Sequence, residues 1–112
     1  MMYNYKAAVT RIVDGDTIIV DIDLGFGVWL KDQSIRLAKI NTPEIRGSTR
    51  EAGNAAKEFL SKLILNKWVQ IRTEKGQEKY GRWLGTVLVE EDNNLIDINS
   101  KMVAEGYAKV YN

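Results

Sequence analysis

Alternating apolar and polar positions in the first forty residues predict three consecutive β-strands. The run 3–13 is rich in β-branched and aromatic residues, and the run 17–23 alternates apolar with polar side chains. The residues between them are Asp14-Gly15-Asp16, in which glycine can supply the positive φ of a tight hairpin turn. A further extended run covers 28–40. The pattern therefore predicts an antiparallel meander.

The segment after this meander has the pattern of an amphipathic helix. Pro43 removes a backbone donor and biases Thr42 toward extended geometry, so the chain should leave the sheet there. Ser48 and Glu51 have the spacing of a helix capping box. Apolar side chains then recur at helical spacing as far as Asn66, namely Ala52, Ala55, Ala56, Phe59, Leu60, Leu63 and Ile64. One long helix is predicted after the third strand.

Two more strands, 68–73 and 84–89, flank the polar segment 74–82. Asn99 is placed to cap a short helix that runs through Glu105 and stops at the following glycine. Five strands with a helix after the third match the order of an α+β fold, the OB-type Greek-key barrel, whose surface often binds oligonucleotides. A mixed α+β sandwich has a similar order of elements and stays open. We expect residues 1–112 to form a single domain.

Composition narrows the chemistry that the chain can perform. The 112 residues include no cysteine and no histidine, which excludes thiolate and imidazole zinc sites, cysteine nucleophiles and histidine-based triads. Carboxylate, amide and hydroxyl oxygens remain, and these suit hard cations such as Ca²⁺ or Mg²⁺. No apolar run is long enough for a signal peptide or a membrane span, so we expect a cytoplasmic protein.

The net charge is only +1, but the charges are unevenly distributed. Segments 36–57 and 67–82 each carry five basic and two acidic residues. They are candidates for one positive face that meets nucleic acid, with separate solvated surfaces as the alternative.

Three short motifs concentrate polar groups. Asp16 stands at the mouth of the first hairpin, where an Asp-Gly turn alone would also explain it. Arg36 precedes Asn41-Thr42-Pro43-Glu44, which combines an amide oxygen, a carbonyl and a carboxylate, or simply marks a strand end. Lys79-Tyr80-Gly81-Arg82 places two cations around an aromatic ring, in what is otherwise a polar turn.

Taken together, these motifs resemble those of the thermonuclease, or staphylococcal-nuclease-like, family. They read DGDT at 14–17, IRLAKINTPE at 35–44 and KYGR at 79–82, in the family's order. The closing EGYAKV at 105–110 is similar to the end of the family's barrel. The resemblance implies a five-stranded OB barrel and a Ca²⁺-dependent nuclease. Such an enzyme cleaves DNA, with RNA as a further candidate, shows little sequence preference and leaves 3′-phosphate ends.

The resemblance also implies roles for individual residues. Asp16 and the backbone carbonyl of Thr42 would hold Ca²⁺, together with Asn41, which stands where the family usually has a second aspartate. By the same resemblance, Glu44 would act as the general base, and Arg36 and Arg82 would bind the phosphate. Lys79 and Tyr80 would contact a neighbouring phosphate and nucleotide.

Asn41 is the main departure from the family pattern. An amide keeps a possible ligand oxygen but removes one negative charge, which predicts a weak site that needs roughly millimolar Ca²⁺. The alternative is a catalytically silent OB domain that binds nucleic acid or a protein. For the nuclease we expect single strands to be preferred as substrates, because unstacking a duplex costs free energy.

Aromatic residues supply two further expectations. Tyr80 and Tyr111 are candidates for stacking on bases. Trp29, Trp68 and Trp83 are expected to pack in the core or within hairpins, although Trp29 has the alternative of an exposed loop aromatic that touches substrate.

Overall fold

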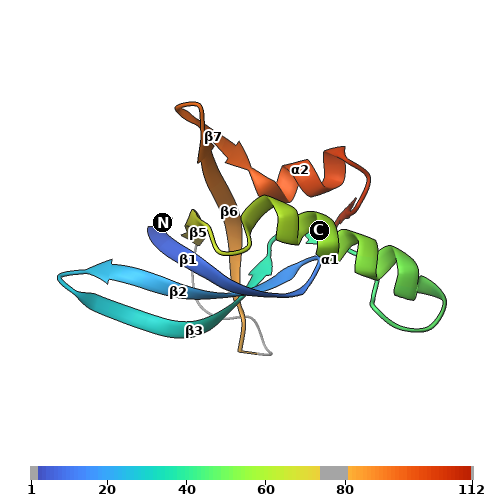
Figure 1. The fold of residues 1–112 in the computed structure, drawn as a ribbon, viewed down its shortest axis with the longest axis horizontal. Helices are drawn as coiled ribbons and strands as arrows, with labels where there is room; N and C mark the ends of the chain where they lie inside the picture. Colours follow the sequence, from blue (N-terminus) through green and yellow to red (C-terminus); the bar gives the residue numbers. More distant parts are fainter. Residues whose placement is uncertain (1–2, 74–80, 112) are drawn as a thin grey trace.

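The protein folds into a closed five-stranded barrel with two helices packed on it (Figure 1). The computed structural model describes residues 3–73 and 81–111. The barrel strands are β1 (Tyr3–Asp14), β2 (Thr17–Gly25), β3 (Val28–Leu37), β5 (Trp68–Thr73) and β6 (Trp83–Glu91). They pair in the order β3-β2-β1-β5-β6, and a parallel contact between β3 and β6 closes the ring. The predicted OB-type α+β fold is confirmed.

Alternation along β2 explains the core of the barrel. Ile18, Val20 and Ile22 point inward and are buried, while the intervening residues face outward.

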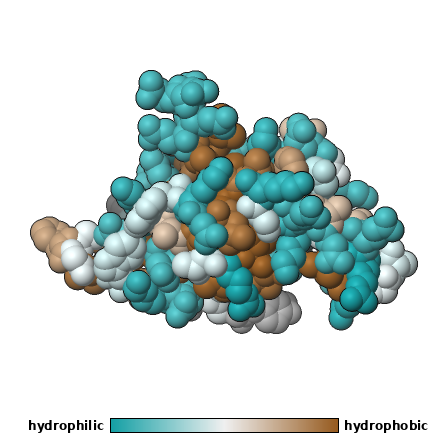
Figure 2. Space-filling model, viewed as in Figure 1, coloured by the Kyte–Doolittle hydropathy of each residue, from teal (hydrophilic) through white to brown (hydrophobic). Residues whose placement is uncertain are grey.

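Figure 2 shows hydrophobic side chains at the end of the projecting β2–β3 hairpin and in the middle of the same face. At the hairpin end these include the exposed side chains of Leu24 and Phe26.

The parallel pairing of β3 with β6 closes the barrel and sets the two strands side by side. Ile35 faces Trp83 and Leu37 faces Gly85 across this pair. The ladder continues where the amide of Ala38 donates to the carbonyl of Gly85 at 2.9 Å. The closure brings the start of β6 alongside the end of β3, so residues at both points can share one site.

Helix α1 (Arg50–Ile64) covers the core with its apolar face, as predicted from the spacing. A 3₁₀ turn, η1 (Gly47–Thr49), precedes it. The predicted capping box is wrong, because Ser48 lies in that turn and the N-cap is Thr49, which makes no side-chain cap bond. The helix also ends before the predicted Asn66, whose φ of 62° places it in a left-handed turn.

Helix α2 (Ile98–Ala104) follows a short strand, β7 (Asn94–Asp97), that the sequence pattern did not predict. Asp97 caps the helix by accepting from the amide of Ser100 at 3.0 Å, so the prediction of Asn99 as the cap is wrong. The buried amide of Asn99 instead bonds three main-chain groups of β6 and the segment after β3. It accepts from Val87 N at 3.0 Å and donates to Ala38 O and Gly85 O at 3.1 Å each.

The end of the described chain returns to the segment after β3. Strand β8 (Lys109–Val110) pairs with β4 (Ile40–Asn41), and the amide of Tyr111 donates to Lys39 O at 2.8 Å. Within residues 3–73 and 81–111, no helix has the length and apolar character needed to cross a membrane.

Replacing Asn99 should strongly destabilise the protein. In Asn99→Leu, two buried main-chain groups, Val87 N and Gly85 O, and the partly buried Ala38 O lose their side-chain partner, which should lower the free energy of unfolding by about 3 kcal/mol. Urea denaturation of this variant measures the loss. The exposed Asn94→Ala is the control and should change stability by less than about 0.5 kcal/mol. Equal stabilities of the two variants would contradict the role given to Asn99.

Candidate functional site

The turn between β1 and β2 packs directly against α1 and the loop after β4. A Cβ added at Gly15 would lie 2.8 Å from Ala56 Cβ and 2.9 Å from the side chain of Thr42. The expectation that Gly15 supplies a positive φ is wrong, since it is not among the glycines of positive φ. Glycine is required here because there is no room for a side chain.

Asp16 follows in this turn, and its carboxylate is nearly buried, with the residue 8% exposed. The amide of Thr42 donates to Asp16 Oδ2 at 3.0 Å, and Thr17 Oγ1 donates to Oδ1 at 3.4 Å. Arg36 Nη2 lies 3.5 Å from Asp16 Oδ2 as an ion pair. The carboxylate therefore links the first hairpin to the loop after β4 and to β3.

The guanidinium of Arg36 contacts several oxygens of the site. Its Nη2 donates to Asn41 Oδ1 at 2.7 Å and to Ile40 O at 2.9 Å, and its Nη1 donates to Leu37 O at 2.7 Å. The side-chain oxygens of Asp16 and Asn41 thus both lie within 3.5 Å of one nitrogen. The structure brings together the residues predicted as metal ligands and one of the predicted phosphate ligands.

Arg82 reaches the same cluster from the opposite side of the barrel closure. Its Nη1 lies 3.4 Å from Thr17 Oγ1, which in turn contacts Asp16. Sequence reasoning did not select Thr17 as a site residue. Its position directly after Asp16 in the DGDT motif was the signal available in the sequence, and the structure places it opposite Arg36 in the β2–β3 register.

Glu44 stands apart from this cluster. Its carboxylate accepts from Arg46 Nε at 2.7 Å, and the two side chains are 67% and 80% exposed. Its backbone, in contrast, is held closely: Thr49 Oγ1 donates to Glu44 O at 2.7 Å, and a Cβ at Gly53 would meet that oxygen at 2.7 Å. The general-base role stays a prediction.

Two predicted substrate contacts, Lys79 and Tyr80, lie outside the residues that the structure describes.

A second carboxylate lies beside Asp16. Asp14 Oδ1 accepts from the amide of Asp16 at 3.0 Å. Burial raises the pKa of Asp14 above its usual value, and a side-chain hydrogen bond and the charge of Asp16 add to the rise. The carboxyl groups of Asp14 and Asp16 therefore lie close together in a partly buried part of the site.

The donor set determines which ion these residues suit. In the described part of the chain, no three His, Cys, Asp or Glu residues group as metal ligands. The side-chain oxygens that the structure brings together are those of the Asp16 carboxylate and the Asn41 amide, and the Thr42 backbone joins them through its N–H. Both are hard oxygens, which fit a cation of the Ca²⁺ class better than zinc.

Gly15→Ala should disturb the site through packing alone. The new methyl group would overlap Ala56 and Thr42, and we expect a loss of about 1–3 kcal/mol in the free energy of unfolding. Thermal denaturation of Gly15→Ala, Ala56→Gly and the double variant forms a cycle that isolates the contact. Strictly additive effects in this cycle would contradict the close approach of the turn to α1.

Comparison with known proteins shows relatives over most of the chain. A family model described as staphylococcal nuclease homologue matches residues 34–112. A micrococcal nuclease of Shigella flexneri is 35% identical, over 96% of this chain and 59% of that protein. A thermonuclease of Staphylococcus intermedius is 33% identical, over 90% and 56%. An uncharacterised protein of Methanocaldococcus jannaschii is 32% identical, over 96% and 60%.

This chain spans about 60% of the length of these curated relatives. The family model covers more than half of the chain, including Arg36, Asn41, Thr42 and Arg82. With the barrel and the site described above, the chain belongs to the staphylococcal nuclease homologues.

Proposed function

We propose that this chain is a Ca²⁺-dependent nuclease that hydrolyses phosphodiester bonds of DNA, and of RNA as a second candidate substrate. The observation that carries the proposal is the cluster in which the oxygens of Asp16 and Asn41 adjoin the Arg36 guanidinium. Arg82 adjoins the same cluster through Thr17. Oxygen donors for a cation and two guanidinium groups in one place can stabilise the charge that develops during phosphodiester hydrolysis. The names of two relatives, micrococcal nuclease and thermonuclease, support the same activity.

In this proposal Asp16, Asn41 and the carbonyl of Thr42 hold the cation, which acts as a Lewis acid on the phosphate when bound. Arg36 and Arg82 bind the non-bridging phosphate oxygens and oppose the charge that builds on them during attack. Arg36 donates to two main-chain carbonyls, Leu37 O and Ile40 O, which orients its guanidinium before substrate arrives.

Glu44 is the proposed general base for the attacking water. Its carboxylate must leave Arg46 to reach the phosphate held at the cluster. The Glu44–Arg46 pair is largely exposed, and such pairs contribute little stability, so this release costs little. The backbone contacts of Glu44 with Thr49 and Gly53 keep the residue at the edge of the site while its side chain moves.

The proposed products carry 3′-phosphate ends, and the proposed substrates are single strands cut with little sequence preference. Lys79 and Tyr80 are proposed to bind the neighbouring phosphate and nucleotide. A second candidate function is a binding module without catalysis, which Asn41 favours because it lowers the negative charge available to the cation.

Arg82→Ala tests the role assigned to Arg82 in catalysis. If Arg82 stabilises the transition state, kcat should fall on the order of 10²–10³-fold while KM changes little. Steady-state cleavage of a labelled single-stranded oligonucleotide at saturating Ca²⁺ measures both constants. The exposed Arg11→Ala removes the same charge elsewhere and should leave kcat unaltered. A raised KM with unchanged kcat in Arg82→Ala would contradict the assigned role.

Asn41→Asp should tighten Ca²⁺ binding on the order of tenfold, because the substitution restores a negative charge beside Asp16. Isothermal titration calorimetry of both proteins with Ca²⁺ measures the change. Asn94→Asp adds the same charge on β7 and should not alter the affinity. An unchanged affinity in Asn41→Asp would remove Asn41 from the ligand set.

A further inference from the structure

Two tryptophans lie against each other on the outer surface of the barrel. The ring centroids of Trp29 and Trp68 are 5.7 Å apart and the rings are tilted by 49°. Trp29 is 40% exposed and Trp68 is 51% exposed. The expectation of core or hairpin packing is met only by Trp83, which packs against the core and donates from Nε1 to Gln33. Trp29 and Trp68 thus keep much of their ring area in contact with water.

Each exposed ring has a lysine beside it. Lys6 Nζ lies 5.0 Å from the ring centroid of Trp68, and Lys31 Nζ lies 5.2 Å from that of Trp29. A base stacked on either ring would bring its phosphate within reach of one of these ammonium groups. Aromatic rings flanked by mobile cations are typical of surfaces that bind single strands.

Two carboxylates on the same surface are engaged locally. Asp21 accepts from the amide of Asp32 at 2.9 Å and pairs with Lys31 at 3.5 Å. Asp23 accepts from the amide of Gly25 at 2.8 Å. The Lys31 side chain is 64% exposed and its Nζ lies 3.5 Å from Asp21, so Lys31 can exchange this partner for a phosphate.

This surface continues to the candidate active site along β3. The β2–β3 register shifts between the pairs Val20–Gln33 and Ile22–Leu30, which inserts an extra residue into β3. The shift keeps Trp29 and Arg36 on the same outward side, although seven positions separate them. At the rise of an extended strand, they are on the order of 20 Å apart. A strand of several nucleotides is therefore needed to contact both.

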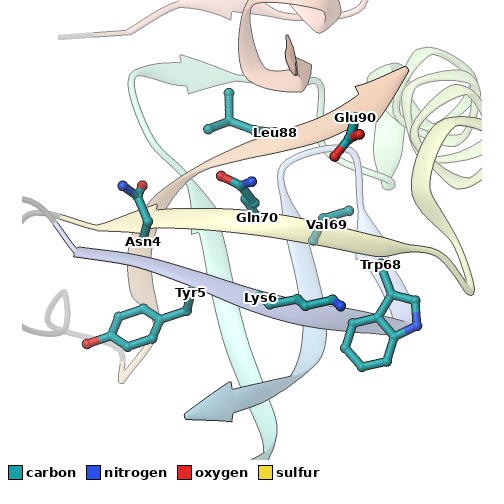
Figure 3. A pocket seen from close by; sticks show the side chains of 8 residues that line it. All are labelled: Asn4, Tyr5, Lys6, Trp68, Val69, Gln70, Leu88 and Glu90. Atoms are coloured by element: carbon teal, nitrogen blue, oxygen red, sulfur yellow. The ribbon is translucent and has the colours of Figure 1, made fainter. Parts of the chain in front are cut away.

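A shallow groove extends from Trp68 across β1, β5 and β6 (Figure 3). Its volume is about 500 Å³, and its lining includes the polar side chains of Asn4, Gln70 and Glu90. Figure 3 shows the side chain of Lys6 running along β1 toward the indole of Trp68. Amide groups beside an aromatic ring can bond the edges of a stacked base. The lining combines the Trp68 ring and apolar side chains with two amides and the Glu90 carboxylate, so a base can stack and bond there.

We propose that Trp29 and Trp68, with Lys6 and Lys31, form a second contact surface for single-stranded nucleic acid on the outer face of the barrel. This inference rests on the proposed function, since it names how a longer substrate is held away from the site of cleavage. Strands long enough to span both surfaces gain affinity from it, and short strands bound at the Asp16 cluster do not.

The test compares oligothymidylates of about four and about sixteen nucleotides, the range of strand lengths that OB domains cover. Binding to the full chain is measured by fluorescence anisotropy in EGTA, where no Ca²⁺ supports cleavage. Trp29→Ala and Trp68→Ala should each weaken binding of the longer strand about five-fold or more and leave the shorter strand unaffected. Trp68→Phe, which keeps a ring, should retain most of the affinity.

Leu95→Ala removes an exposed apolar side chain on β7 and is the matched control, with circular dichroism confirming that each variant is folded. Unchanged binding of the longer strand by both tryptophan variants would overturn the proposal. The proposal would also be overturned if the tryptophan variants lost no more affinity for the longer strand than Leu95→Ala does. It would equally be overturned if sedimentation showed that the tryptophan substitutions change only self-association of the chain.

The outcomes for the proposed nuclease are separate. If the unmodified chain cleaves nothing with Ca²⁺ but the tryptophan variants weaken binding of the longer strand, the nuclease proposal fails and the second surface stands. If the chain cleaves and these variants bind normally, the second surface fails alone.

Discussion

The parallel contact between β3 and β6 is the interaction on which the rest of the structure depends. It converts a twisted sheet into a closed barrel and sets the end of β3 beside the start of β6. The buried amide of Asn99 bonds main-chain groups on both sides of this contact. Since Arg36 lies on β3 and Arg82 directly precedes β6, the same closure determines whether two guanidinium groups meet at one site.

The second requirement is that helix α1 approaches the site loops without bulky side chains. Gly15 in the first turn and Gly53 on the helix are both placed where a Cβ would collide with neighbouring atoms. Because these two glycines have no side chains, the turn that contains Asp16 and the loop that contains Glu44 can pack against the helix. The buried carboxylate of Asp16 then accepts from the Thr42 amide, so packing and hydrogen bonding hold the same geometry.

Much of this could be predicted from the sequence, because alternation and helical spacing are local signals. The barrel strands, α1 and the three motifs follow from them. The role of Gly15 could not be predicted, because its collision partners are distant in sequence. Asn99 was predicted as a cap because asparagine is a favoured N-cap residue, whereas its true partners lie on β6 and beyond β3. The exposure of Trp68 was not predicted, and that of Trp29 was predicted only as an alternative, because hydrophobicity alone does not show which face of a strand is outside.

The central claim is that the cluster around Asp16 hydrolyses phosphodiester bonds when it holds Ca²⁺. The most direct measurement is cleavage of a labelled single-stranded oligonucleotide by the unmodified chain, with Ca²⁺ titrated from micromolar to tens of millimolar. We expect cleavage that saturates in the roughly millimolar range of Ca²⁺ and stops in EGTA. Absence of cleavage at every Ca²⁺ concentration, with oligonucleotide binding intact, would contradict it.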